Sequence, residues 1–175
     1  VPISPNSRRQ LTLLVAEPWR SRLNALRLNL DPIQESLISA HVTPCREDEI
    51  EHLAPMSLHS RVESWALGPL CMAFGPPRQF QGHGVLLPCS HGSDQFQRLR
   101  QWLLQDRAAR EHGAHLTLAH PRNPRAEGNT ASTMEACPQA LELKFSSVAL
   151  IEQLGSAPWR FLQESTLGGA IRDEA

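Results

Sequence analysis

Two short segments of the chain carry the same pair of chemically active side chains. His41 and Thr43 stand two residues apart in one apolar-flanked stretch, and His115 and Thr117 repeat the arrangement 74 residues later. In an extended strand, residues i and i+2 point to the same face, so each segment presents an imidazole beside a hydroxyl. Two such pairs facing one cleft would supply two proton-transfer groups and two neutral hydrogen-bond donors. That set suits an anionic phosphodiester, because one histidine can accept a proton while the other delivers one.

The surroundings of both triplets resemble the two-histidine (2H) phosphoesterase superfamily, in particular its bacterial 2'-5' RNA ligase-like branch. The strongest local match is the sequence A-H-L-T-L-A-H-P-R-N at 114–123. The resemblance extends from the apolar run at 11–16 to the closing strands between 141 and 167. It implies that both histidines are catalytic and that both threonines bind phosphate.

The activity implied by this resemblance is a metal-independent hydrolysis of 2',3'-cyclic phosphate ends of RNA or of nucleotides. Reversible 2'-5' RNA ligation would be the same chemistry run backwards. By analogy with the family, His41 would be the acid and His115 the base during hydrolysis. Pro44 stands where the family often has an aliphatic residue, which leaves the assignments of His41 and Thr43 intact. The alternative is a module that binds a nucleotide or RNA on the same fold without turnover. The intact pair of triplets favours the enzyme.

Arginines after the second triplet are candidates for further phosphate contacts. Arg122 and Arg125 lie in the stretch 121–138, which is rich in loop-forming residues and directly follows the second motif. Active-site loops often occupy such a place, and guanidinium groups bind phosphate oxygens as a bidentate fork. His120 stands at odd parity from His115, so a continuing strand would turn it away from the cleft. We therefore expect a structural role for His120, or at most a contact from a loop.

Other residues that could support a site each have a plainer interpretation. Cys45 shares the parity of Thr43, but a buried small apolar side chain is the safer interpretation. A metal cluster would need a fourth ligand and better spacing than is offered by His83, Cys89 and His91. We expect neither a metal nor another cofactor. Three aromatic residues could stack on a base or equally pack in the core: Trp65, Phe74 and Phe80.

Composition predicts one domain with a substantial core and no general attraction for nucleic acid. The chain has 175 residues, 41% of them hydrophobic, and a formal net charge of −1. Because there is no global positive field, recognition of a phosphate must come from local arginines. We expect an RNA end or a cyclic nucleotide as substrate, and a monomer without an obligate protein partner. Four cysteines without a metal-binding pattern, and no apparent signal or membrane segment, indicate a cytoplasmic protein with reduced thiols.

The hydrophobic pattern predicts an α+β fold with two lobes related by a pseudo-twofold axis. A strand, a helix and a His-x-Thr strand occur in that order at 11–43 and again at 80–117. Each lobe would be an antiparallel sheet with helices outside, and the lobes would enclose a central cleft. Residues 1–175 would form one domain, with 1–9 as a loose arm and 168–175 as a tail. Further strands are predicted at 62–74, 141–154 and 159–167, and a short acidic helix at 47–53.

Overall fold

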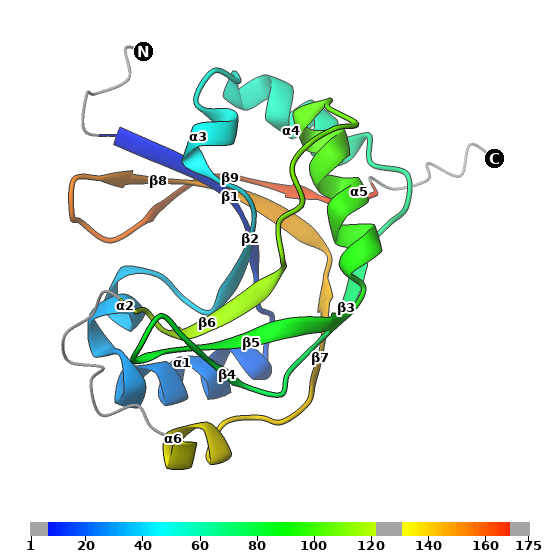
Figure 1. The fold of residues 1–175 in the computed structure, drawn as a ribbon. Helices are drawn as coiled ribbons and strands as arrows, with labels where there is room; N and C mark the ends of the chain where they lie inside the picture. The colour runs from blue at the N-terminus through cyan, green and yellow to red at the C-terminus, as the bar shows by residue number, and fades with distance from the viewer. Residues whose placement is uncertain (1–6, 122–130, 169–175) are drawn as a thin grey trace.

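The computed structural model of the chain describes residues 7–121 and 131–168 and consists of two antiparallel sheets flanked by helices (Figure 1). The first sheet has the strand order β2-β1-β8-β9. Its strands are β1 (Ser7–Leu14), β2 (His41–Cys45), β8 (Ser147–Leu154) and β9 (Arg160–Thr166). The second sheet has the order β4-β5-β3-β7, and β6 pairs with the other edge of β5. Its strands are β3 (Leu70–Phe74), β4 (Arg78–Phe80), β5 (Gly84–His91), β6 (His115–Ala119) and β7 (Leu141–Phe145).

Helices cover the two sheets from opposite ends of the molecule. Two of them, α1 (Trp19–Leu30) and α2 (Pro32–Leu37), lie at one end in Figure 1. At the other end lie α3 (Glu47–Ile50), α4 (Pro55–Glu63) and α5 (Ser93–Leu104). A further short helix, α6 (Ala131–Glu135), precedes β7. The predicted α+β class with two antiparallel sheets is confirmed. None of the helices in the described part of the chain has the length and apolar character needed to cross a membrane.

The repeated order of elements is realised as two equivalent β-α-β units. In the first, β1 and β2 pair antiparallel, with Leu14 opposite His41. In the second, β5 and β6 pair antiparallel, with Pro88 opposite His115. The helix of each unit also contacts the His-x-Thr strand of the other unit, because α1 packs on β6 and α5 packs on β2. The two motif strands contact one another as well, so the units meet at the motifs.

The core is one connected hydrophobic cluster that draws side chains from both sheets. Leu11 and Leu13 of β1 belong to it, as do Leu116 and Leu118 of β6. The chain crosses directly from the second sheet to the first, because β7 ends at Phe145 and β8 begins at Ser147. The predicted single strand at 141–154 is therefore wrong. It is two strands in different sheets: the alternating pattern of β7 ends at Phe145, and β8 continues with four consecutive buried residues at 148–151.

Two other element predictions also need correction. Ser7–Arg9 do not belong to a loose arm, because β1 begins at Ser7 and Arg8 is paired with Gln153 of β8. The strand predicted at 62–74 starts at Leu70, since α4 occupies the preceding stretch and buries Leu58 and Val62 on one face. Helical spacing of these two residues, four apart, competes there with their strand propensity. Residues 1–6 and 169–175 lie outside the described part of the chain.

Candidate functional site

The two His-x-Thr strands have identical patterns of burial. In both β2 and β6, the histidine and the threonine are half-buried, while the residue between them and the two that follow are buried. The i, i+2 parity of an extended strand thus places each imidazole and its hydroxyl on the same, partly open face. Val42 and Leu116, which stand between them, enter the core.

Each histidine is held by the same backbone contact. Nδ1 of His41 lies 2.8 Å from the carbonyl oxygen of Ser39, and Nδ1 of His115 lies 2.7 Å from that of Gly113. A carbonyl oxygen only accepts, so Nδ1 must be the protonated nitrogen in both rings. In the neutral imidazole, Nε2 then keeps a free lone pair and can accept a proton. In both motifs, the carbonyl group of the residue two positions before the histidine therefore selects the same tautomer, with the proton on Nδ1.

A polar cavity of about 420 Å³ opens where the two motif strands meet. It is bounded by residues of β1, α1, α2, β2, β6 and the loop before β9: Arg8, Gln10, Arg27, Ile33, Gln34, Ile38, His41, Thr43, Thr117, His120 and Trp159. Two of these residues are arginines, and none of the described lining residues is acidic. Such a cavity suits an anionic group. His41, Thr43 and Thr117 thus line one cavity, whereas His115, which the two-motif hypothesis placed beside them, is not among the lining residues.

Burial at this junction holds His41 in its neutral form. The pKa of His41 falls from its ordinary value near 6.5 to about 4, chiefly because burial disfavours the imidazolium. The Ser39 carbonyl opposes this effect, whereas positive charge on Arg27 and His115 adds to it. The effect of His115 on His41 reflects the proximity of the two motif histidines. At pH 7 in the unliganded protein, His41 is a proton acceptor.

A third histidine, His112, packs against the second motif. Its ring centroid lies 5.9 Å from that of His115 and 6.5 Å from that of Phe96 in α5. The pKa of His112 falls to about 4, first because of burial and then because of positive charge on Arg100. His112 is therefore an uncharged neighbour of His115 near neutral pH. His115 itself is half-buried and is not among the residues that line the cavity.

Arg27 is a cavity residue that sequence reasoning missed. It lies on α1 with only 2% of its surface exposed. Its guanidinium donates to the carbonyl of Ile38 at 2.7 Å and more weakly to that of Gln34 at 3.4 Å. Within the described residues, its buried Nε has no hydrogen-bond partner. A buried cation with a remaining donor beside a cavity can bind an anion at little cost in side-chain ordering.

Two further cavity residues come from segments outside both motifs. Trp159 precedes β9, is half-buried, and has the guanidinium carbon of Arg8 5.3 Å from its ring centroid. Its backbone N–H donates to the carbonyl of Leu37 at 2.9 Å, which fixes the loop before β9 to the end of α2. His120 also lines the cavity, contrary to the expectation that it turns away. β6 ends at Ala119, so the alternation of side chains along an extended strand no longer determines where His120 points.

Several predicted candidates lie elsewhere. Arg122 and Arg125 fall outside the described residues. Cys45 is fully buried, and burial raises the pKa of its thiol to about 12, which makes it inert packing. Trp65 and Phe74 belong to the core, so neither is free to stack on a base. Phe80 on β4 is 38% exposed.

No metal cluster forms among the described residues. There, no three His, Cys, Asp or Glu side chains come together in a group that could hold an ion. The spacing of His83, Cys89 and His91 does not translate into such a group. Instead, the Cys89 thiol donates to the backbone carbonyl of His91 at 3.0 Å. A hydrogen-bonded thiol with a raised pKa is a poor metal ligand.

Together, fold and site define a two-lobed α+β protein in which two matched His-x-Thr strands meet beside a cationic cavity. No protein-family model and no curated protein matches the sequence. Among solved structures, E. coli LigT in apo form matches with a TM-score of 0.64 at 15% identity, covering 94% of this chain and 99% of LigT. LigT complexed with 3'-AMP matches at 0.62 and 14% identity, over 93% and 99% of the two chains. A phosphoesterase matches at 0.61 and 12% identity, over 93% and 99%. At these identities the likeness establishes the fold, which is the one that the sequence resemblance implied.

Proposed function

We propose that the protein is a metal-independent phosphodiesterase that hydrolyses 2',3'-cyclic phosphate ends of RNA or of nucleotides. The carrying observation is the matched pair of motif strands at one cationic cavity, each with its histidine locked by a backbone carbonyl. This arrangement offers a base, an acid and neutral donors for a phosphodiester without a metal ion. The fold shared with E. coli LigT and with a phosphoesterase supports the same class of chemistry.

The low pKa of His41 suggests how the two histidines divide the work. A neutral His41 can take a proton from water through Nε2 as the water oxygen bonds to phosphorus. His115 then protonates the ribose oxygen that leaves as its bond to phosphorus breaks. This assignment reverses the one implied by the resemblance, because a group with a pKa of about 4 has no proton to deliver at pH 7. With a ribose 5'-hydroxyl in place of water, the same attack on the cyclic phosphate forms a 2'-5' linkage: His41 takes the hydroxyl proton and His115 protonates the 3'-oxygen as its bond to phosphorus breaks. The roles exchange only when that linkage is cleaved again.

The phosphate would be held by hydroxyls and by a buried cation. Thr43 and Thr117 present their hydroxyls to the cavity, and Arg27 adds charge and an unused Nε–H. Preorganised donors of this kind stabilise the charge that develops on non-bridging oxygens in the transition state. Arg122 and Arg125 remain candidates for the same task, since their segment follows the second motif.

The nucleoside part of the substrate would extend toward Trp159. A half-buried indole at a cavity wall provides a face on which a base can stack, and Arg8 lies over the same ring. The structure of E. coli LigT complexed with 3'-AMP shows that a protein of this fold accepts a nucleotide. Trp159 is the feature that favours a nucleotide or an RNA end over a simple phosphate ester in this proposal.

The direct test offers purified protein a 2',3'-cyclic nucleotide and an oligonucleotide with a cyclic phosphate end. We expect ring opening of at least one of them to a phosphomonoester, whose 2' or 3' position is then identified by comparison with standards. Binding of both without turnover would instead establish the alternative, a nucleotide- or RNA-binding module.

Chelation of metals should leave this hydrolysis unchanged. The acid, the base and the phosphate contacts all come from side chains, so excess EDTA has nothing to remove. The measurement is the turnover rate after dialysis against EDTA, compared with samples given zinc or magnesium. Activity that vanishes with EDTA and returns with either metal would contradict the mechanism.

Removing either threonine hydroxyl should weaken phosphate binding and slow turnover. Thr43→Val or Thr117→Val keeps the β-branched shape but deletes one neutral donor, so kcat/KM should fall by about tenfold to a hundredfold. Thr43→Ser and Thr117→Ser should retain most activity. Thr166→Val, at an exposed position on β9, is the matched control. Equal kcat/KM in all five variants would exclude the proposed phosphate contacts.

A further inference from the structure

A second buried arginine occupies the place in α5 that Arg27 occupies in α1. Leu23 and Arg27 are the buried residues of α1, and Phe96 and Arg100 repeat them 73 residues later in α5. The motif histidines repeat after 74 residues. Arg100 is completely buried. Each β-α-β unit thus places a buried guanidinium at the same point of its helix.

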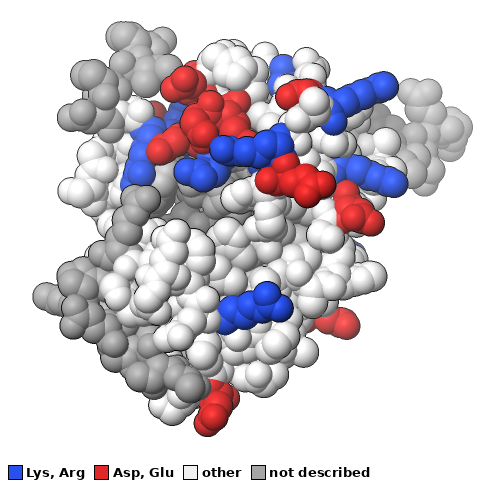
Figure 2. Space-filling model, viewed as in Figure 1, with Lys and Arg blue, Asp and Glu red and all other residues white. Residues whose placement is uncertain are grey.

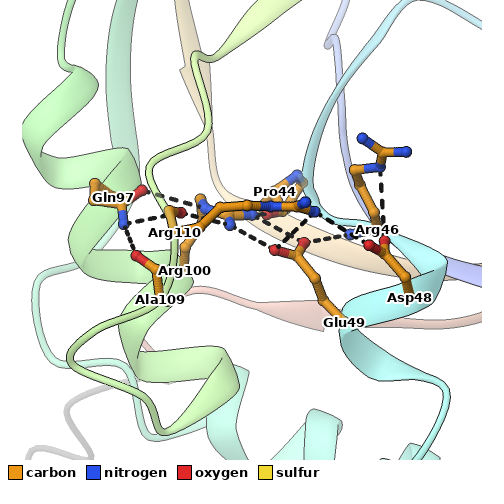
Figure 3. Close-up of polar contacts among 8 residues, drawn as sticks. All are labelled: Pro44, Arg46, Asp48, Glu49, Gln97, Arg100, Ala109 and Arg110. Atoms are coloured by element: carbon orange, nitrogen blue, oxygen red, sulfur yellow. Dashed lines mark hydrogen bonds and ion pairs between the residues drawn. The ribbon is translucent and has the colours of Figure 1, made fainter.

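Arg100 bridges the two units through five hydrogen bonds to four groups (Figure 3). Its guanidinium donates to Glu49 at 2.8 and 3.2 Å, to the carbonyl of Pro44, to the carbonyl of Arg110 at 3.1 Å and to Gln97 at 3.3 Å. Glu49 also accepts from the backbone N–H of Arg46 at 2.9 Å. The arginine belongs to the second unit, whereas Pro44 belongs to the first and Glu49 to α3, which directly follows the first.

The carbonyl groups that Arg100 binds adjoin both motifs. Pro44 directly follows Thr43 on β2. Arg110 lies in the segment that leads from α5 to β6, shortly before His112 and His115. One planar guanidinium therefore fixes the end of the first motif strand against the approach to the second. A lysine could not reproduce this, because it lacks the fork that reaches several acceptors at once.

The opposite connection exists on the other side of the site. The carboxylate of Asp31, at the end of α1, accepts from the backbone N–H of His120 at 2.7 Å. His120 follows β6, so a residue of the first unit holds the end of the second motif strand. Each helix region thus anchors the motif strand that belongs to the other unit. This reciprocity accords with the packing of α1 on β6 and of α5 on β2.

We propose that Arg100 is a positioning residue, which holds the His41–Thr43 strand and the segment before His115 in the relative placement that catalysis needs. The inference rests on the proposed function, because it assigns the two strands a common task.

The contacts of Arg100 with Glu49, Pro44 and Arg110 are not part of the charged surface of the protein. Acidic and basic side chains do intermingle over the region of α3 (Figure 2), but Arg100 lies beneath them with no exposed surface. A buried ion pair is weak evidence for stability and is better attested as a device that fixes one arrangement.

The test compares Arg100→Gln and Arg100→Lys with Arg61→Gln as a matched control. Arg61 of α4 donates to the carbonyl of Leu103 in α5 at 2.6 Å, so its loss removes a similar backbone contact of the same helix away from the motifs. We expect kcat of Arg100→Gln on a cyclic nucleotide to fall by about tenfold to a hundredfold, since small misplacements of reacting groups have such effects. Its KM should change little. Arg100→Lys should also be impaired, whereas Arg61→Gln should keep the wild-type kcat.

A second readout does not depend on turnover. Histidine-ring NMR follows the titration of His41, which is packed near Arg27 of α1, His115 of β6 and the Ser39 carbonyl. In folded Arg100→Gln, looser placement of β2 should move the His41 titration toward its ordinary range. This readout applies even if the wild-type protein hydrolyses no cyclic phosphate, so failure of the proposed activity and failure of the positioning role remain distinguishable.

Unchanged kcat together with an unchanged His41 titration in folded Arg100→Gln would overturn the proposal and leave Arg100 as packing alone. If that variant does not fold, Glu49→Gln is used instead to test the positioning role of Arg100. It keeps the shape of the carboxylate partner but removes its charge, so kcat should fall about threefold to tenfold as the hold on Arg100 weakens. A folded Glu49→Gln protein with wild-type kcat and His41 titration would equally overturn the proposal.

Discussion

His41→Ala and His115→Ala should each reduce turnover of a 2',3'-cyclic nucleotide by about a hundredfold to ten-thousandfold, the usual contribution of a positioned proton-transfer group. Because base and acid act in one reaction, the double variant should be hardly slower than the slower single variant. The measurement is kcat and kcat/KM for the three variants, with folding checked by circular dichroism.

The pH dependence of kcat/KM assigns the two roles. A base must be deprotonated to act, so its titration gives the acidic limb, and the acid gives the basic limb. With His41 as base in the free protein, the acidic limb should lie near pH 4 and disappear in His41→Ala. Loss of the basic limb in that variant instead would restore the assignment of His41 as the acid.

His91→Ala is the matched control for both histidine variants. His91 is exposed at the end of β5 and is one of the three residues that were considered as a metal cluster. Its replacement should leave turnover unchanged. Near wild-type turnover in folded His41→Ala and His115→Ala would show that neither histidine is catalytic, and the binding-module interpretation would then apply.

Local periodicity explains why the motif geometry could be predicted from sequence. Strand parity depends only on neighbouring residues, so the shared face of His41 and Thr43 follows once β2 is recognised. The same holds for His115 and Thr117 on β6. The order of strand, helix and strand likewise predicts two equivalent units. The antiparallel pairing of β1 with β2 and of β5 with β6 does not follow from that order, which is more typical of parallel strands, and came only from the family resemblance.

The remaining cavity residues could not be found in this way, because long-range packing places them. Arg27 looks like an ordinary surface arginine in the pattern of α1, and only the packing of α1 against other elements, including α2 and β6, buries it. Trp159 reaches the cavity because its backbone bonds to Leu37, more than a hundred residues earlier. One signal was available: Arg27 and Arg100 recur after 73 residues, nearly the histidine repeat. Comparison of the two halves residue by residue would have singled them out.

Errors in the elements arose where two local signals compete. Asp31-Pro32 is typical of a helix end, because proline disfavours helical backbone in the residue before it, and α1 does end at Leu30. The same residues also start α2, because Asp31 caps it by accepting from Gln34 N–H at 3.1 Å and Pro32 suits a first turn. The dipeptide therefore both ends α1 and begins α2. Its second role matters, since α2 contributes Ile33 and Gln34 to the cavity.

Folding stability should fall as the pH is lowered from about 6.5 toward 4, because of buried neutral histidines. The folded-state pKa of His41 is about 4, against 6.5 for an ordinary histidine. In that window the unfolded chain binds a proton that the folded chain excludes, so stability is fully present above pH 6.5 and is lost as pH falls. The full shift corresponds to roughly 3 kcal/mol for His41. His112, whose pKa falls in the same direction, adds to the loss.

Urea unfolding at pH 7.0, 6.5, 6.0 and 5.5 measures the onset of this loss. These values stay above the range, near the ordinary pKa of 4.5, in which Glu49 and Glu152 of the unfolded chain take up protons that their lowered folded-state pKa values exclude. In His41→Asn, the amide N–H can still donate toward Ser39, but no proton is gained, so the free energy of unfolding should depend less on pH. His91→Asn should retain the wild-type dependence. If His41→Asn lost stability with falling pH as steeply as the wild type, His41 would not be held neutral by burial, and its role as base would lose its physical support. The same property that makes His41 a proton acceptor at pH 7 thus makes the fold sensitive to acid, and the two can be tested independently.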